Sequence, residues 1–407
     1  MDPSARKIFN NNFTVEKYKA FLAKLNNGLH TPIAFRVAET PVFLTGEFRD
    51  KLISAGNDII DTIIRPDFKQ LTERAIPDKR RVANENDHPH FIALDFAVCK
   101  DTAGNIVPKL IELQGFPSLY AFQAELGGKF REDFDIDNSW SVYFSGLDKA
   151  SYINLLKQTI VGDFEPDEVV LMDVSAPEQK TAADFFMTQK YLGVPVVSLG
   201  ELEQEGTQLF YRLNGEKKQI KRIYNRLIFD EIDHDPDIFK KVVDIRKPLD
   251  VEWITHPNWF YRVSKFTMPF LKGEYIPVTR FLHDVTQIPA DLENYVLKPL
   301  FSFAGQGVII DISKNDIQKI KDPENWILQQ KVNYEPLIQA PDSGVKMEIR
   351  LLYLWPDGYE KPVLAINLAR LSRGKMIGVR YNKDFDWVGG TVAFMPLGSS
   401  PPKPNTI

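Results

Sequence analysis

The chain has 407 residues, of which 43% are hydrophobic and 12% aromatic, and this is enough apolar material for the cores of two or three domains. A formal net charge of −5, with both signs interspersed, argues against binding to nucleic acid or to an anionic membrane surface. A single cysteine excludes an intramolecular disulfide, no apolar run reaches the roughly 18 residues of a membrane span, and we therefore expect a cytoplasmic enzyme without nucleic-acid or membrane partners.

The first predicted elements are two helices, at residues 14–25 and 47–63. Apolar side chains recur in both segments with helical spacing. Thr14 and Thr45 stand just before them, where a hydroxyl group accepts a hydrogen bond from the unpaired N–H groups of the first turn. We expect the two helices to pack as a layer beside the strands that follow.

Two strands are predicted next, at residues 90–98 and 108–118, joined by a polar turn. Because side chains alternate between the two faces of a strand, Glu112 and Gln114 share a face, and Asp95 is available from the neighbouring strand. Magnesium prefers oxygen ligands and is usually held by one or two carboxylates together with nucleotide phosphates. These three residues are therefore a candidate metal site, and the alternative is a surface turn flanked by solvated carboxylates.

Residues 150–231 alternate helices with short apolar strands, a pattern that predicts a small doubly wound α/β unit. In such a unit, ligands bind beyond the carboxyl ends of the strands. Asn225 and Arg226 follow the strand at residues 220–224, where the guanidinium group could hold an acidic substrate. The alternative for Arg226 is a solvated arginine in a basic hairpin.

A candidate phosphate-binding loop follows, because Lys298 ends an apolar strand and precedes a loop of small residues and a second apolar strand. Ser302, Gly305 and Gly307 let backbone N–H groups approach an anion closely. Lys298 and the upstream Lys265 add positive charge for the phosphates. The alternative is an ordinary hairpin whose lysine is solvated.

The C-terminal third supplies the remaining candidate residues. Residues 326–332 are predicted to be a strand that runs into a polar connector, where backbone donors and acceptors could bind an adenine edge. The candidate adenine contacts there are Gln329, Gln330, Lys331 and Val332. Further strands are predicted between residues 347 and 394. They carry Arg350, which together with Lys298 is a candidate catalytic residue. They also carry the candidate substrate contacts Arg370, Arg373, Gly389 and Gly390.

The order of four motifs resembles the circularly permuted branch of the ATP-grasp superfamily, exemplified by the synthetase domain of glutathionylspermidine synthase. In chain order, these motifs are Leu-Asp95-Phe, Lys-Leu-Ile-Glu112, Lys265, and Lys298-Pro with its glycine loop. The resemblance implies a mixed α/β (α+β) fold in which two antiparallel sheets with helices close over ATP. It also implies three units. They are residues 1–149 with the first helices and the metal strands, residues 150–255 as a pre-ATP-grasp-like α/β domain, and residues 256–407 with the lysines, glycine loop and hinge.

The function that this resemblance implies is an ATP-dependent ligase, which uses Mg²⁺ and joins a small-molecule or peptide carboxylate to an amine through an acyl phosphate. The chain departs from the family at two positions, with Gln114 in place of asparagine and Ala93 in place of arginine. Arg350, Arg370 or Arg373 would have to supply the missing charge. The alternatives are a small-metabolite kinase and a catalytically degenerate ATP-binding protein, and the sequence names neither the substrates nor the oligomeric state.

Overall fold

The computed structural model describes residues 1–232, 237–301, 306–339, 344–374, 377, 382 and 384–397. Its α-helices are α1 (Pro3–Asn12), α2 (Val15–Asn26), α3 (Gly46–Ile63), α4 (Phe68–Leu71), α5 (Tyr120–Asp133), α6 (Lys149–Ile160), α7 (Ala182–Leu192), α8 (Phe229–Ile232), α9 (Ile238–Lys241), α10 (Pro257–Arg262) and α11 (Lys314–Gln318). Within the described ranges, no helix is both long and apolar enough to cross a membrane.

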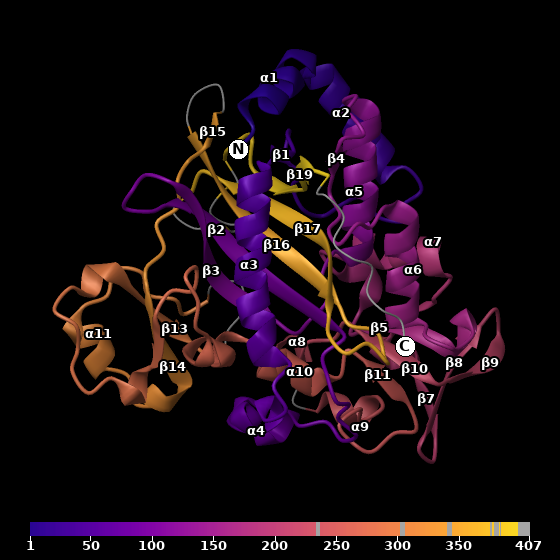
Figure 1. The fold of residues 1–407 in the computed structure, drawn as a ribbon. Helices are drawn as coiled ribbons and strands as arrows, with labels where there is room; N and C mark the ends of the chain where they lie inside the picture. Colours follow the sequence, from indigo (N-terminus) through magenta and orange to yellow (C-terminus); the bar gives the residue numbers. More distant parts are fainter. Residues whose placement is uncertain are drawn as a thin grey trace.

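The central sheet joins segments from distant parts of the chain (Figure 1). Its spatial order is β18 (Gly389–Thr391), β17 (Val363–Ser372), β16 (Gly344–Leu354), β2 (Phe91–Lys100) and β3 (Ile106–Gln114), and β15 (Ile338–Gln339) pairs with β16. All these neighbours are antiparallel. The hairpin of β2 and β3 therefore lies beside strands that come from the C-terminal third.

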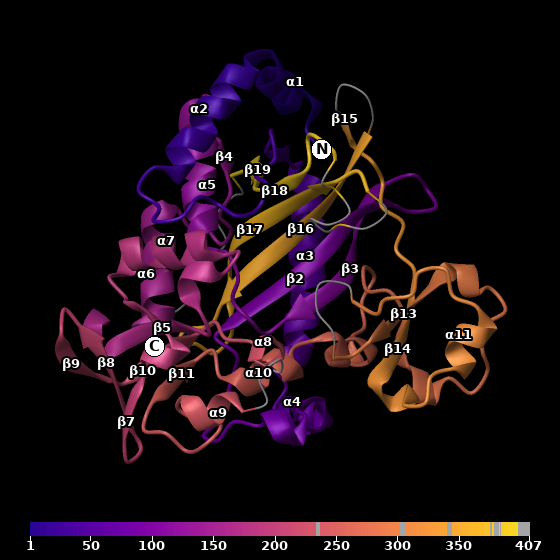
Figure 2. The ribbon, with the colours of Figure 1, turned by 180° about the vertical axis from the view of Figure 1, so that it is seen from behind.

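Helices cover the two faces of the central sheet (Figures 1 and 2). On one face α3 packs against β16 so closely that a Cβ atom on Gly56 would come within 2.1 Å of the Tyr353 hydroxyl oxygen. On the other face the Tyr120 hydroxyl of α5 donates to the carbonyl oxygens of Ile92 and Tyr353, at 3.0 and 3.2 Å. Ala93 belongs to the core on the α5 side, and strand alternation places Asp95, two residues further along β2, on that side too.

Three smaller sheets surround this centre. A parallel sheet is formed by β11 (Glu252–Ile254), β10 (Arg222–Asn225), β5 (Val169–Asp173) and β6 (Val196–Ser198), and a hairpin sheet by β7 (Glu203–Glu205), β8 (Gln208–Leu213) and β9 (Glu216–Ile220). The third consists of β1 (Val42–Phe43), β19 (Ala393–Pro396) and β4 (Trp140–Ser141). The parallel sheet with α6 and α7 confirms the predicted alternation of strands and helices after residue 150.

A small antiparallel sheet lies beside β3 (Figure 1). It consists of β12 (Thr279–Phe281), β14 (Trp326–Gln330) and β13 (Tyr295–Pro299), in that order, and the 3-10 helix η6 (Lys265–Phe270) packs against β3, β12 and β14. Backbone bonds tie the adjoining segment to β3, because Leu110 N–H donates to the Tyr275 carbonyl oxygen at 2.9 Å. Two antiparallel sheets thus meet along β3.

Most of the local predictions agree with these elements. Thr14 and Thr45 do cap α2 and α3, and their hydroxyl oxygens accept from the N–H groups of Lys17 and Phe48 at 3.2 and 3.3 Å. The mixed α/β fold with antiparallel sheets is consistent with the predicted α+β class. The second apolar strand predicted after the glycine loop is wrong, because only an isolated bridge between Leu297 and Ile309 forms there.

Candidate functional site

The central feature of the site is a buried aspartate held by two arginines. Asp95, with 1% of its surface exposed, lies in the middle of β2 directly opposite Arg350 of β16. Arg350 donates from Nε and Nη2 to the two carboxylate oxygens, at 2.5 and 2.6 Å, and Arg370 of β17 donates to Oδ2 at 2.7 Å. A bidentate contact of this kind fixes both charged groups in one orientation.

A second carboxylate completes the cluster. Glu348 lies on β16 opposite Arg370, whose Nη2 donates to it, and the Tyr334 hydroxyl donates to Glu348 Oε2 at 2.9 Å. The sequence pattern indicated no site role for Glu348 or Tyr334. The available signal was the spacing of Glu348 two residues before Arg350, which puts both side chains on one face of the strand.

The two carboxylates differ in their proton affinity. Burial by itself raises the pKa of Asp95, but the charges of Arg350 and Arg370 outweigh burial and hold this pKa below its usual value. For Glu348, burial dominates over the attraction of Arg370, and the negative charge of Asp95 adds to it, so its pKa is raised. Asp95 is thus the firmly ionised member of the pair.

The predicted magnesium ligands are only partly placed as a metal would need them. Glu112 and Gln114 share a face of β3, as strand alternation predicted. In the sheet, Asp95 of β2 lies opposite Glu112, and Ala93 lies opposite Gln114. However, both oxygens of Asp95 accept from guanidinium groups, and Gln114 Nε2 donates to Glu112 Oε1 at 3.0 Å. Among the described residues no group of three His, Cys, Asp or Glu is arranged to hold a metal ion. Asp95 does not fit a metal in this arrangement, and we derive no step through magnesium.

The predicted lysines reach the same region from the small sheet. Lys298 of β13 extends to β3, where its Nζ donates to the carbonyl oxygen of Ile111 at 3.1 Å, and Lys265 Nζ donates to that of Pro299 at 3.3 Å. Burial lowers the pKa of Lys298 to about 8, although the charge of Glu112 opposes this effect and Lys265 adds to it. Two buried ammonium groups and Glu112 therefore gather where the two sheets meet.

The side-chain amide of Gln329, in the predicted adenine segment, is buried without a hydrogen bond. Its side chain is 1% exposed, and neither its amide nitrogen nor its amide oxygen has a hydrogen-bond partner among the described residues. Lys298 lies opposite Ile327 of β14, and Gln329, two residues further along β14, shares their face of the sheet. A buried amide in this state costs about 1–3 kcal/mol, which a ligand that pairs with it would remove.

The other predicted adenine contacts are occupied by the protein's own backbone. The N–H groups of Gln330 and Lys331 donate to the carbonyl oxygens of Val278 and Asn294, at 2.9 and 2.7 Å. Val332 packs, half-buried, against the core. Of this segment, the side chain of Gln329 is thus the group that the fold leaves unpaired within the described chain.

The glycine loop is described in part. Ser302 and Gly305 lie outside the described residues. Gly307 has a φ of +70°, and a Cβ atom there would come within 2.9 Å of the Pro299 ring, so the turn requires glycine at this position.

Two predicted substrate residues, Arg226 and Asn225, are held by contacts within the protein. Arg226 is 4% exposed and donates to the carboxylate of Asp184 at 2.6 Å. Asp184 also accepts from the N–H groups of Leu119 and Phe122 at the start of α5, both at 3.0 Å. Asn225 exchanges hydrogen bonds with the backbone of Leu227. These contacts explain both residues without a substrate.

The last four predicted substrate contacts differ in position. Arg370 joins the Asp95 cluster, whereas Arg373 donates to the carbonyl oxygen of Asp386 at 3.4 Å. Gly389 lets β18 approach the segment at Arg36, because a Cβ atom on it would lie 2.4 Å from the Arg36 carbonyl oxygen, whereas a Cβ atom on Gly390 would meet no atom closer than 3.8 Å. A substrate role for these glycines stays a prediction.

No protein-family model matches the chain, and no curated protein sequence matches it. Among solved structures, the chain is similar to an apo-form glutathione synthetase-like effector from Globodera pallida, with a TM-score of 0.59 and 11% identity over 95% of this chain and 99% of the other. At this identity the likeness shows the fold alone. It extends over nearly the whole length of both chains.

Proposed function

We propose that the protein is an ATP-dependent carboxylate–amine ligase of the ATP-grasp type. The observation that carries this proposal is the meeting of the two antiparallel sheets, where Lys298 and Lys265 lie buried beside Glu112 and the unpaired Gln329 amide shares the face of Lys298. Buried charges, and a buried amide without a hydrogen bond, are costly unless a ligand uses them. The glutathione synthetase-like fold of the structural neighbour supports the same class.

In this proposal ATP lies between the sheets, with its phosphates at the two lysines and its base at Gln329. A carboxylate substrate attacks the γ-phosphorus, ADP leaves, and an amine then displaces phosphate from the acyl phosphate. Positioning and positive charge supply most of the catalysis, so the protein needs no nucleophile of its own. The magnesium ion that the sequence predicts stays a prediction.

The arginine roles in this mechanism follow from exposure. The Arg370 side chain is 31% exposed, whereas that of Arg350 is 8% exposed. We therefore assign contact with the substrate's developing charge to Arg370, and a positioning role to Arg350, which orients Asp95. These two arginines take the place of the arginine that the family carries at the position of Ala93.

The test traps the acyl phosphate. The protein is incubated with ATP, magnesium and a panel of small carboxylic acids, and hydroxylamine serves as the surrogate amine. A ligase forms a hydroxamate and releases one ADP with it, and Arg370→Gln abolishes both products. Release of ADP without hydroxamate, with transfer of phosphate to a hydroxyl compound, would instead identify a kinase.

One observation favours a second candidate, a protein that binds ATP without turning it over. Asp95 is already paired with two arginines and does not fit a metal, so the described carboxylates leave the magnesium set incomplete. Such a protein would bind ATP with the same dependence on Lys298 but would release no ADP with any acid and amine. Binding and turnover measured on the same preparation separate the two candidates.

A further inference from the structure

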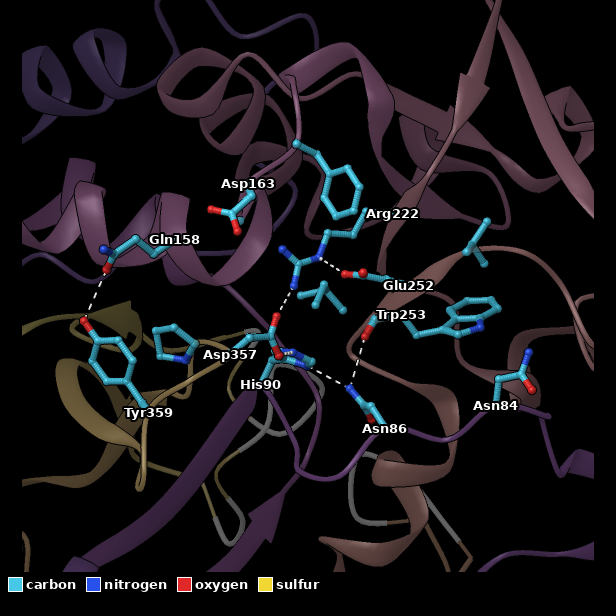
Figure 3. Close-up of a pocket in the computed structure, with 15 residues that line it drawn as sticks. Asn84, Asn86, His90, Gln158, Asp163, Arg222, Glu252, Trp253, Asp357 and Tyr359 are labelled. Carbon is cyan, nitrogen blue, oxygen red and sulfur yellow. Dashed lines mark hydrogen bonds and ion pairs between the residues drawn. The ribbon is translucent and has the colours of Figure 1, made fainter. Parts of the chain in front are cut away.

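A polar pocket lies at the start of β2 (Figure 3). It has a volume of about 610 Å³ and is lined by the segment before β2, the end of α6 and the turn after it, the strands β10 and β11, and the turn after β16. His90 in its lining precedes Asp95 by five residues, which corresponds to about 16 Å along a strand. Its lining also shares no residue with the proposed nucleotide site at Lys298, Lys265 and Gln329.

Arg222 is the buried cation of this pocket. Its side chain is 2% exposed, its Nη2 donates to Asp357, and its Nε makes no hydrogen bond within the described chain, although the Glu252 carboxylate lies 3.5 Å away. A Cβ atom on Gly162, where φ is +61°, would come within 1.9 Å of Arg222 Nη1. Glycine at this position thus makes room for the guanidinium group.

His90 is neutral and fixed in one tautomer. The indole N–H of Trp259 donates to Asn86 Oδ1 at 2.8 Å, so the Asn86 amide nitrogen faces His90 Nδ1, at 3.2 Å. Nδ1 must therefore accept, and Nε2 carries the proton that it donates to Asp357 at 3.0 Å. Burial lowers the pKa of His90, which keeps the ring uncharged at neutral pH.

The charge that remains in the lining is negative. Three carboxylates, Asp163, Glu252 and Asp357, face one guanidinium group, and Asp163 is exposed. Three aromatic side chains, Phe164, Trp253 and Tyr359, also line the pocket. Figure 3 shows Gln158 and Tyr359 on one side of the space and Trp253 on the other, with Arg222, Asp357 and His90 between them. Carboxylates and aromatic rings together attract ammonium groups through charge and cation–π contacts.

We propose that this pocket binds a small organic cation that carries an ammonium group, independently of the nucleotide site. Asp163 and Glu252 supply its counter-charges, and Arg222 and His90 hold Asp357 in place at the floor of the pocket.

The test is calorimetric titration of the full chain with choline and with 1,4-diaminobutane, at an ionic strength matched with sodium chloride. We expect saturable binding of at least one of these probes, and none of 3,3-dimethylbutan-1-ol, the uncharged analogue of choline. Asp163→Asn or Glu252→Gln should weaken binding by up to about fivefold each. The matched control is Glu293→Gln, which neutralises an exposed carboxylate outside the pocket and should leave the affinity unchanged.

A further variant separates this site from the nucleotide site. Lys298→Met should leave the affinity for the ammonium probe unchanged, since the two sites are distinct. The proposal is overturned if neither ammonium probe binds, if the neutral alcohol binds equally well, or if Glu293→Gln weakens binding as much as the pocket variants.

Discussion

Two buried arginine–aspartate contacts in this protein serve different purposes. In the Arg226–Asp184 pair, the carboxylate also accepts hydrogen bonds from the backbone N–H groups of Leu119 and Phe122 at the start of α5, so its remaining partners are backbone groups of the fold. In the Asp95 cluster, two arginines share one aspartate, and the adjoining Glu348 has a raised pKa. The difference teaches that burial of a charge pair does not identify its role, and that the partners of each oxygen do.

The largest expected effect on the free energy of unfolding is at the Arg226–Asp184 pair. Arg226→Met should lower the free energy of unfolding by about 3–5 kcal/mol, because it leaves the Asp184 charge buried without its partner. Urea unfolding measures this loss. The control Arg212→Met removes a 59% exposed arginine paired with Glu203 and should cost at most about 1 kcal/mol. A loss below about 1 kcal/mol for Arg226→Met would contradict a structural role.

The stability of the Asp95 cluster should respond less to removal of an arginine. Arg370→Gln should lower the free energy of unfolding by only about 1–2 kcal/mol, because Arg370 is 31% exposed and Asp95 keeps its bidentate contact with Arg350. The Glu348 carboxyl group, whose pKa is already raised, can take up a proton when its partner is gone. The loss should therefore shrink between pH 7 and pH 5, and a loss that grows on acidification would argue against this assignment of Glu348.

The pH dependence of nucleotide binding sharpens the contrast further. Lys298, with a pKa of about 8, loses its charge as the pH rises, and the proposed phosphate contact requires the charged form. ATP affinity should therefore fall above about pH 8, by at most about tenfold per pH unit. Titrations from pH 7 to pH 10 check this, and Lys298→Arg should flatten the profile because an arginine keeps its proton throughout. An unchanged affinity at pH 10 would exclude a charge role for Lys298.

The smallest expected effect carries an opposite sign. Gln329→Leu should raise the free energy of unfolding by about 1 kcal/mol, because it removes a buried amide that has no hydrogen bond within the described chain. The same change should weaken ATP binding. Thermal unfolding with and without ATP measures both effects, and a variant that is less stable than the wild type would mean that the amide already has a partner.

The sequence predicted what local pattern controls. Thr14 and Thr45 are N-caps as expected, and β2 and β3 form the predicted hairpin that brings Asp95 and Glu112 onto neighbouring strands. Both features depend on residues that are close in the chain or joined by one short turn. Local propensity and the period of two are sufficient for such features.

The sequence did not predict what long-range pairing controls. The contact of Asp95 with Arg350 depends on the register of β16 against β2, two strands from distant parts of the chain. A shift of one residue would turn Arg350 to the other face. The pairing of Arg226 with Asp184 likewise depends on how α7 lies relative to the residue that follows β10. The sequence pattern therefore could not predict which groups bind the two oxygens of Asp95, nor that Arg226 forms a buried ion pair.

The most direct test is calorimetric titration of ATP into the wild type, Lys298→Met and Lys319→Met. Lys319 is exposed on the same small-sheet unit and is the matched control for loss of one positive charge. We predict that the wild type and Lys319→Met bind ATP alike, and that Lys298→Met binds about 100-fold more weakly, a difference of about 2.7 kcal/mol. Equal affinity of all three proteins, or no binding by the wild type, would contradict a nucleotide site between the two sheets.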